Sequence, residues 1–231
     1  MIYLFSGTPG SGKSLHCAQY VRSALKYRCP VIGTFHINKT CLYKNSKYDY
    51  IYKNIYDLTP SFLINFVKEN KVYLKKHIES SFLLVIDEAQ RIFNSRTWNN
   101  KDRNDWITFF AEHRHLGFDI ILVSQNDRML DRQIRALIEY EFIHRKVSAA
   151  GLKGKILSLF VGQFCYVKYW YGMKERLSSE FYWANKSLYS FYDSFEDFSD
   201  LSSDTSLEVS EAESGVMGSP GDDSEDFEEK A

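Results

Sequence analysis

A glycine-rich segment near the start of the chain most constrains the fold that this sequence can adopt. Residues 1–6 form an apolar run typical of a buried strand, and the pattern from residue 15 to about residue 26 is helical. Strand, glycine loop and helix in this order are typical of the phosphate-binding P-loop, and a turn that binds nothing is the alternative. The loop reads G-x-x-x-x-G-K-S, with Gly7, Thr8, Pro9, Gly10, Ser11, Gly12, Lys13 and Ser14.

The residue types in this loop suit a nucleotide. Glycines lack a Cβ atom, so the loop can pass close to a phosphate and turn its N–H groups inward. The following helix directs its N-terminus toward the same anion. In such a loop we expect Lys13 to reach the β- and γ-phosphates and the Ser14 hydroxyl to bind Mg²⁺. ATP and Mg²⁺ are therefore the expected ligands.

A second segment, about seventy residues later, complements the loop. Residues 82–86 are continuously apolar, as in strands buried on both faces of a parallel sheet, and Asp87 and Glu88 follow directly. Parallel sheets bind ligands at the carboxyl ends of their strands. The segment thus has the pattern of a Walker B strand, in which Asp87 would hold the Mg²⁺ shell and Glu88 would polarise the attacking water.

The segment from residue 99 to residue 125 predicts a helix and a strand. Asn99 or Asn100 is expected to cap the helix, and Gly117 is expected to end it. Residues 118–124 predict a buried strand, and Gln125 at its end is expected to contact the γ-phosphate or the attacking water. The apolar stripe of the helix is expected to contain Trp106, Ile107, Phe109, Phe110, His113 and Leu116. Arg114 and His115 are expected to face a phosphate or a neighbouring subunit.

Three arginines follow that strand. Asp131 is predicted to cap a short helix that runs to about residue 137. Arg128, Arg132 and Arg135 lie near its start. One of them is expected to serve as an arginine finger for the nucleotide of a neighbouring subunit, with ordinary surface arginines as the alternative.

The remaining elements are predicted with less detail. Residues 30–34 predict a short buried strand, and Thr59 with Pro60 predicts the start of a helix to about residue 68. Lysines and tyrosines mix between residues 43 and 56, which is typical of half-buried packing or of a stacking surface for nucleic acid. Residues 140–147 and 156–171 are expected to form a terminal hairpin, with residues 149–154 as its turn.

Charge divides the chain into two parts. Residues 193–231 hold fourteen of the thirty acidic residues and one of the twenty-nine basic ones, so residues 1–192 carry a net charge of +12. We expect a basic α/β domain over residues 1–192 and an acidic, disordered tail over residues 193–231. The basic part could attract nucleic acid or phospholipid head groups, or simply be a solvated surface.

Composition also excludes several classes of protein. The four cysteines show no paired spacing and are expected to be reduced thiols, and no zinc site is expected. Residues 156–167 are too few to span a bilayer, and no cleaved signal peptide is expected ahead of the P-loop. These observations predict a cytosolic protein that does not cross a bilayer by itself.

Three segments together resemble the zonular occludens toxin (Zot) family over about residues 1–180. They are the loop at 7–14, the D-E-A-Q sequence at 87–90, and H-R-H-x-G-x-D at 113–119 with Ser124 and Gln125 after it. The resemblance implies a RecA-like P-loop ATPase with a mainly parallel sheet flanked by helices, similar to FtsK/HerA-like motors. Members usually carry one transmembrane helix after this domain, whereas this chain continues into its acidic tail, which puts membrane anchoring and any toxin activity in doubt.

The resemblance implies a function and several partners. The expected function is that of an ATP-hydrolysing motor for filamentous-phage morphogenesis, which exports or packages single-stranded DNA. It would act as a homo-oligomer, such as a hexameric ring, with single-stranded DNA and with phage coat or membrane assembly proteins. The resemblance also implies a place in the host cytoplasm, peripheral at the inner face of the membrane through a partner. Two alternatives stay open: a small P-loop kinase, which the carboxylate of Glu88 beside Asp87 disfavours, and a nucleotide-dependent interaction module with slow turnover.

Overall fold

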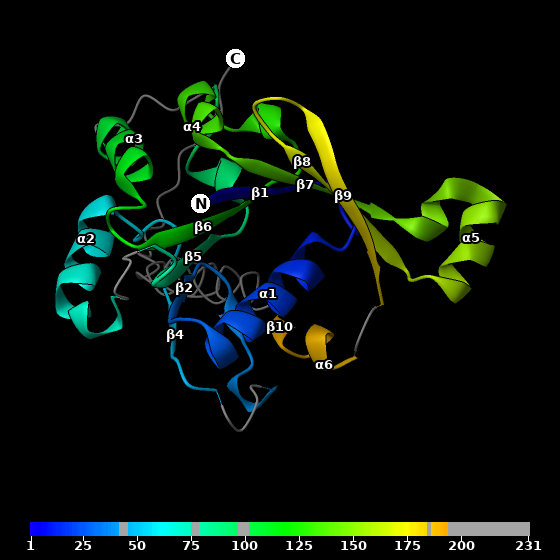
Figure 1. The fold of residues 1–231 in the computed structure, drawn as a ribbon, viewed down its shortest axis with the longest axis horizontal. Helices are drawn as coiled ribbons and strands as arrows, with labels where there is room; N and C mark the ends of the chain where they lie inside the picture. Colours follow the sequence, from blue (N-terminus) through cyan, green and yellow to red (C-terminus); the bar gives the residue numbers. More distant parts are fainter. Residues whose placement is uncertain (42–45, 75–78, 97–101, 184–185, 194–231) are drawn as a thin grey trace, which may run out of the picture. The chain divides into compact units, whose positions relative to one another are not determined.

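The computed structural model describes residues 1–41, 46–74, 79–96, 102–183 and 186–193. An eight-stranded sheet forms its centre (Figure 1), in the order β4-β2-β5-β6-β1-β7-β8-β9. The strands from β4 to β7 run parallel, and β8 and β9 are antiparallel to their neighbours. The strands are β1 (Ile2–Ser6), β2 (Val31–Gly33), β4 (Tyr50–Tyr52), β5 (Phe82–Ile86), β6 (Phe118–Val123), β7 (Tyr140–Lys146), β8 (Phe164–Trp170) and β9 (Glu175–Tyr182).

Helices cover both faces of this sheet. Tyr3 and Phe5 of β1 pack under α1, whereas Ile2 and Leu4 pack under the helices of the opposite face. This alternation follows from the two-residue period of a strand, and it explains why central strands such as β5 are apolar throughout. One face carries α1 (Lys13–Tyr27) and α6 (Lys186–Tyr189), and the other carries α2 (Pro60–Glu69), α3 (Arg103–Glu112) and α4 (Arg132–Leu137).

Capping residues begin the helices largely where the sequence predicts. The Thr59 side chain accepts a hydrogen bond from the N–H of Phe62, and Asp131 accepts one from Gln133 at 2.8 Å. Helix α3 begins at Arg103, after Asp102, so the predicted caps Asn99 and Asn100 lie outside the described residues. It ends at Glu112, and a turn leads to Gly117, whose φ of 81° is left-handed.

The first strand of the predicted terminal hairpin and its antiparallel pairing are confirmed, but the predicted turn and the predicted start of the second strand are wrong. Residues 149–160 do not form a turn and a strand: a 3₁₀ turn, Val147–Ala150, leads into α5 (Gly151–Phe160), and β8 begins only at Phe164. A short apolar run such as 156–161 suits a helix and a strand equally well, so its pattern could not decide between them. Strand β9 was not predicted, because its residues are nearly all exposed and show no buried alternation.

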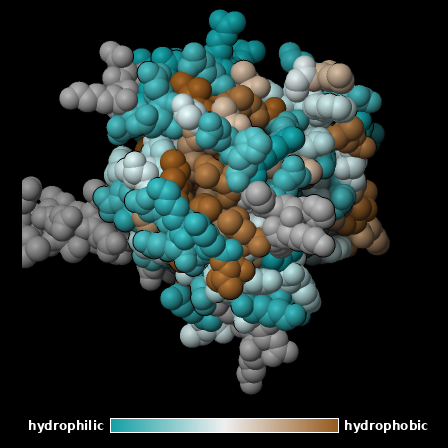
Figure 2. Space-filling view, turned by 60° about the vertical axis from the view of Figure 1, so that its left-hand side comes forward, coloured by the Kyte–Doolittle hydropathy of each residue, from teal (hydrophilic) through white to brown (hydrophobic). Residues whose placement is uncertain are grey.

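The tyrosines near residue 50 serve packing. Tyr50 is buried and its hydroxyl donates to the carbonyl of Phe35 at 2.5 Å, while the Tyr52 ring stacks on His36. The face that carries α2 and α3 is mainly hydrophilic, with a band of apolar side chains across it (Figure 2). All four cysteines are free thiols, as predicted. Among the described residues, no helix has the length and apolar character needed to cross a membrane.

A short segment that we call the strap, residues 191–193, packs on the same side of the sheet as α1. Strand β10 (Tyr192–Asp193) pairs antiparallel with β3 (His36–Ile37), which follows β2. Phe191 is fully buried beside them, and its carbonyl accepts a hydrogen bond from Asn38. The strap thereby brings Tyr192, far along the sequence, to the carboxyl edge of the sheet.

Candidate nucleotide site

The loop after β1 has a backbone that only glycine permits. Gly7 and Gly12 have φ of 143° and 95°. A Cβ atom on Gly7 would lie 2.5 Å from the carbonyl oxygen of His144, and one on Gly12 would lie 2.6 Å from the hydroxyl of Tyr182. These contacts come from the parallel strand β7 and the antiparallel strand β9, so the loop is packed against this side of the sheet. The sequence pattern therefore reflects both the conformation of the loop and its neighbours.

Lys13 lies folded into this loop. Its ammonium donates hydrogen bonds to the carbonyls of Gly7 at 2.8 Å and Thr8 at 3.2 Å. Burial lowers the pKa of Lys13, while the carboxylates of Asp87 and Glu88 act in the opposite direction. The two carboxylates are thus close enough to act on the lysine. The hydroxyl of Ser11 is also buried, and it has no hydrogen-bond partner among the described residues, as expected of a loop that binds an anion.

Asp87 is fixed at the end of β5 by its neighbours. Its N–H donates to the Thr34 hydroxyl at 2.8 Å, and its Oδ2 accepts a hydrogen bond from the hydroxyl of Tyr192. Burial raises the pKa of Asp87, although the hydrogen bonds from Tyr192 and from the N–H of Glu88, together with Lys13, partly oppose the shift. The hydroxyl of Tyr192 also interacts with the side chain of Ser14. One tyrosine therefore touches both predicted Mg²⁺ ligands, which places Ser14 and Asp87 close together.

The donor set suits Mg²⁺. A hydroxyl and one carboxylate supply hard oxygen ligands and leave the remaining positions to water and phosphate, which is how Mg²⁺ is usually bound beside nucleotides. Within the described residues no cluster of three His, Cys, Asp or Glu side chains could hold a metal by itself, so the site differs from a structural metal centre.

Glu88 has an unusual backbone conformation. Its φ of 48° and ψ of 43° are left-handed, which is uncommon for a residue with a Cβ atom and is often found at functional sites. Its side chain is exposed, and its carboxylate accepts a hydrogen bond from the amide of Gln90. The D-E-A-Q sequence thus forms one local unit, in which Gln90 orients Glu88.

Gln125 lies between the two motifs. Strand β6 separates β1 from β5 in the sheet, so the residue after β6 emerges between the P-loop and Asp87. The carbonyl of Gln125 accepts a hydrogen bond from Gly7 at 3.3 Å, and its side chain is exposed. The structure therefore brings Gln125 to the edge of the loop, and its contact with the γ-phosphate or the attacking water stays a prediction.

The three predicted finger arginines lie away from the P-loop of their own chain. Arg128 and Arg135 line a separate cavity of 660 Å³ with Asp127 and Tyr171. Arg135 lies 4.0 Å from the carboxylate of Asp127, and Arg132 is exposed at the start of α4. None of the three lines the pocket at the P-loop.

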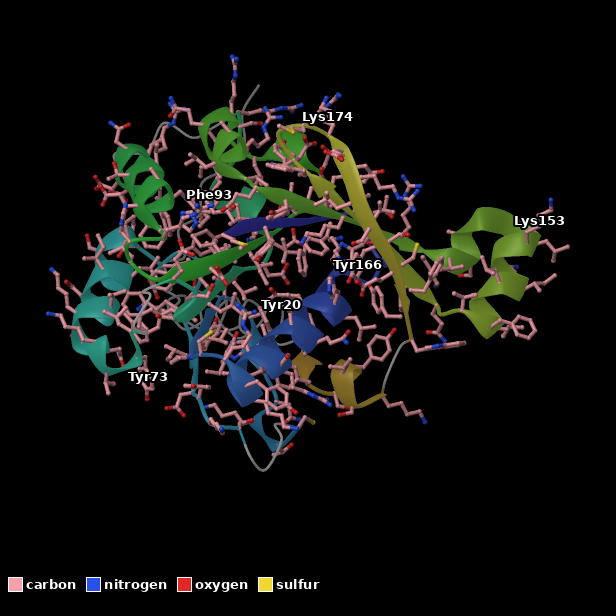
Figure 3. All side chains as sticks on the ribbon, in the orientation of Figure 1. Tyr20, Tyr73, Phe93, Lys153, Tyr166 and Lys174 are labelled. Atoms are coloured by element: carbon pink, nitrogen blue, oxygen red, sulfur yellow. The ribbon has the colours of Figure 1, made fainter. Side chains whose placement is uncertain are left out.

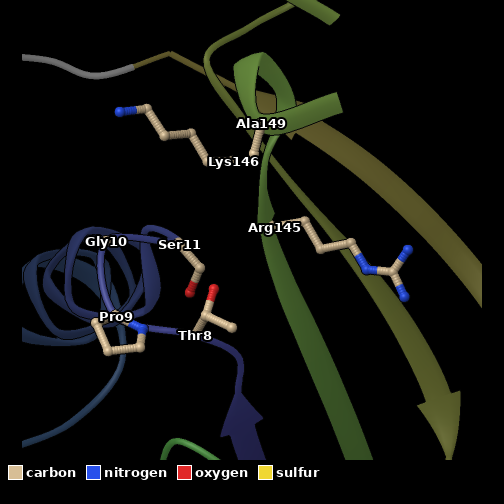
Figure 4. Close-up of a pocket in the computed structure, with 7 residues that line it drawn as sticks. All are labelled: Thr8, Pro9, Gly10, Ser11, Arg145, Lys146 and Ala149. Atoms are coloured by element: carbon tan, nitrogen blue, oxygen red, sulfur yellow. The ribbon is translucent and has the colours of Figure 1, made fainter. Parts of the chain in front are cut away.

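Two cations that the sequence did not single out line the P-loop pocket. Arg145 and Lys146, at the end of β7, border a pocket of 550 Å³ together with residues 8–11 of the loop (Figure 4). Lys146 extends over the loop near Gly10, whereas Arg145 points away from it. The sequence did not indicate them, because their position depends on strand pairing. Strand β7 pairs in parallel with β1, so the residues at the end of β7 lie beside the P-loop.

A buried histidine pair supports the loop from behind. The Nδ1 of His16 lies 2.8 Å from the Nε2 of His144, and the Nδ1 of His144 lies 3.1 Å from the carbonyl of Ser6. Because a carbonyl only accepts, His144 donates from Nδ1 and accepts from His16. Burial lowers the pKa of His16 to about 3 and that of His144 to about 4, so both rings are neutral. This pair was also missed, because the two residues are 128 positions apart.

The H-R-H-x-G-x-D segment lies at the opposite edge of the sheet. His113 is buried, as predicted, with its Nδ1 2.7 Å from the carbonyl of Phe110. Arg114 forms an ion pair with Glu139 at 2.6 Å and stays half exposed, and His115 is exposed, so their contact with a phosphate or a neighbouring subunit stays a prediction. Asp119 forms ion pairs with Arg28 and with the amino group of Met1, both at 2.9 Å. These residues anchor the start of β1.

Comparison with known proteins identifies the family and the fold. The family model "Zonular occludens toxin (Zot)" matches residues 1–164. The chain belongs to the Zot family. Its fold also resembles the N-terminal domain of zonular occludens toxin from Neisseria meningitidis, with a TM-score of 0.51 and 18% identity over 83% of this chain and 98% of that one. The Zot assignment and this fold agree with the predicted P-loop NTPase, with its mainly parallel, RecA-like sheet.

Other similarities are more local. Gene 1 protein of Enterobacteria phage M13 is 40% identical over 83 residues, which are 35% of this chain and 24% of that protein. Gene 1 protein of Salmonella phage IKe is 36% identical over 35% of this chain and 23% of its own length. The matches thus span about a quarter of these relatives. The DNA-packaging ATPase B204 from Sulfolobus Turreted Icosahedral Virus shares the fold at a TM-score of 0.50 and 17% identity, over 76% of this chain and 95% of that one.

Proposed function

We propose that this chain is an ATP-hydrolysing motor for filamentous-phage morphogenesis, which drives the export or packaging of single-stranded DNA. The observation that carries the proposal is the convergence of Lys13, Asp87 and Glu88 at the carboxyl edge of a parallel sheet. The gene 1 proteins of filamentous phages support the viral setting. The fold shared with a DNA-packaging ATPase supports the movement of DNA.

Each residue of the site has a chemical role in this proposal. The N–H groups of residues 7–14 bind the phosphates, and Lys13 exchanges its bonds to the loop carbonyls for bonds to the β- and γ-phosphates. Ser14 and Asp87 would hold Mg²⁺, which would neutralise charge on the phosphates. Glu88 accepts a proton from the attacking water. Gln125 contacts the γ-phosphate or that water.

The proposed active unit is an oligomer. Arg128, Arg132 and Arg135 lie away from the P-loop pocket of their own chain, so an arginine finger would have to reach the site of a neighbouring subunit. We propose a ring, such as a hexamer, at the cytoplasmic face of the host membrane, with coat or membrane assembly proteins as partners. The ATPase domain would be residues 1–192, and residues 193–231 would be an acidic appendage.

Steady-state ATP hydrolysis by the full chain, with and without single-stranded DNA, tests this function. We expect hydrolysis that single-stranded DNA stimulates and that requires Mg²⁺. Turnover only in the presence of a phosphate acceptor would indicate the kinase. Tight ATP binding without turnover or DNA stimulation would indicate the interaction module.

Mixing experiments test the shared site. Lys13→Ala subunits should be rescued in part by subunits that lack the correct arginine, because some interfaces then combine two intact halves. Lys146→Ala tests the alternative that the cation comes from the same chain, since Lys146 already borders the P-loop of its own chain. If Lys146→Ala abolishes activity and no arginine variant does, the cation comes from the same chain and the finger proposal fails.

A further inference from the structure

Helix α5 has an apolar surface that this domain does not cover. It stands away from the rest of the domain, between β7 and β8 (Figure 1). Gly154 is its only buried residue. Its large side chains are exposed, with relative exposures of 76% for Leu152, 72% for Leu159 and 79% for Phe160. So many exposed apolar residues on one short helix indicate a binding surface.

Four apolar residues of α5 share one side of the helix. Leu152, Ile156 and Leu159 follow the spacing i, i+4 and i+7, and Phe160 lies beside Leu159 on the next step. Leu157, which is 45% exposed, lies on another side of the helix, and Val161, which is 37% exposed, follows its end. Helix α5 is therefore amphipathic, but its apolar side faces outward.

The charges on α5 and on the residues that flank it in the sequence are all positive. Lys153 and Lys155 lie on the helix, and Arg145 and Lys146 lie where the chain enters it. Lys153 points away from the domain at the outer end of the helix (Figure 3). The sequence holds no acidic residue between Glu141 and Glu175. The nearest acidic group of β9 is Glu180, which pairs with Tyr166 and whose carboxylate is hydrogen-bonded to that tyrosine.

We infer that α5 binds the surface of an anionic phospholipid bilayer, with its aliphatic side chains and Phe160 in the interface and its lysines at the head groups. A helix with one apolar side and lysines beside it is typical of interfacial membrane binding, and each lysine adds attraction to anionic lipid. Single-stranded nucleic acid is the less suitable partner for this charge, because stacking platforms are aromatic and α5 has one aromatic residue, Phe160.

Co-sedimentation of the full chain with lipid vesicles tests this inference. The probes are vesicles of phosphatidylcholine alone and vesicles with one third phosphatidylglycerol. We expect binding to the anionic vesicles, and a reduction of about tenfold or more in the variants Leu159→Ser/Phe160→Ser and Lys153→Ser/Lys155→Ser. The matched control is Lys71→Ser/Val72→Ser, which also removes an exposed lysine and an exposed apolar residue and should bind like the wild type.

A second variant reports on α5 directly and keeps its apolar character. Tryptophan emission of Phe160→Trp should shift to shorter wavelength on anionic vesicles, after subtraction of the wild-type signal, because the ring enters an apolar environment. No shift, or sedimentation that α5 variants and control lose equally, would overturn the inference. Loss of oligonucleotide binding or of self-association in the α5 variants, with vesicle binding intact, would assign α5 to DNA or to a second copy instead.

Discussion

The two edges of the central sheet carry charged residues of similar kinds but arrange them differently. At the amino edge, the charges of Asp119, Arg28 and the Met1 amino group satisfy one another, as do those of Arg114 and Glu139. At the carboxyl edge, Lys13 bonds to backbone carbonyls and Glu88 is exposed. The comparison teaches that a charged motif is structural where its charges are paired within the fold, and is available for a ligand where they are not.

The largest expected effect separates the two edges by activity. Lys13→Ala should lower ATP hydrolysis about a hundredfold or more, because it removes a cation from the developing charge on the phosphates. Arg114→Ala, at the other edge, should leave the rate per folded molecule unchanged. Steady-state rates of the two purified variants provide the check. A comparable loss in Arg114→Ala would show that the edges are not functionally distinct.

The next effect concerns pH. The folded-state pKa values of His16 and His144, about 3 and about 4, lie below the ordinary 6.5. The unfolded chain therefore binds more protons, and stability falls as pH drops from about 6.5 toward 4. Between pH 7 and pH 5 the two rings together should lower the free energy of unfolding by about 4 kcal/mol. Urea unfolding of the wild type and of His16→Phe should be measured from pH 7 to pH 5. The free energy of unfolding should depend less steeply on pH in the variant, and identical pH dependences would exclude His16 as a source of the effect.

A smaller effect tests the amino edge by stability. Asp119 is 3% exposed, and its partners Arg28 and Met1 are 35% and 51% exposed, so water can rehydrate them if the carboxylate is lost. Asp119→Asn should therefore lower the free energy of unfolding by about 2 kcal/mol, less than for a fully buried pair. Thermal unfolding measures this, with the exposed Asp57→Asn as control. A loss of hydrolysis without a loss of stability would contradict the structural assignment.

The smallest expected effect concerns the proposed Mg²⁺ site at the carboxyl edge. The Tyr192 hydroxyl bonds to Asp87 and touches Ser14, so Mg²⁺ must displace it to bind both. Tyr192→Phe should therefore bind Mn²⁺, a spectroscopic substitute for Mg²⁺, about threefold to tenfold more tightly. Electron paramagnetic resonance measures free Mn²⁺ in the presence of ATP, and Tyr189→Phe, which is half exposed, is the control. Weaker binding in Tyr192→Phe would mean that this hydroxyl supports the metal site.

Most of the site was predictable because its chemistry is local. The loop at 7–14, the strand before Asp87 and the strand before Gln125 each combine a glycine or apolar pattern with residues at its end. Parallel pairing then brings strand ends to one edge, so the grouping of these residues followed from the fold class.

The remainder depends on contacts between distant segments. Tyr192 reaches Asp87 across 105 positions, and Lys146 borders the P-loop because β7 pairs with β1. Helix α5 was not predicted, because an apolar run of this length fits a buried strand as well as a helix. Only the burial of its side chains distinguishes the two, and in the structure these side chains are exposed. The role of the H-R-H-x-G-x-D segment was likewise decided by its partners, Glu139 and Met1, which no spacing indicates.

The central claim is that the carboxyl edge hydrolyses ATP, and Glu88→Gln tests it most directly. The substitution removes the proton acceptor and leaves the phosphate loop, Lys13 and Asp87 unchanged. Nucleotide affinity and single-turnover hydrolysis should be measured on the same preparation, with single-stranded DNA present. We predict that Glu88→Gln binds ATP as tightly as the wild type and hydrolyses it at least about a hundredfold more slowly. Hydrolysis at the wild-type rate would contradict the role of Glu88 and with it the proposed mechanism.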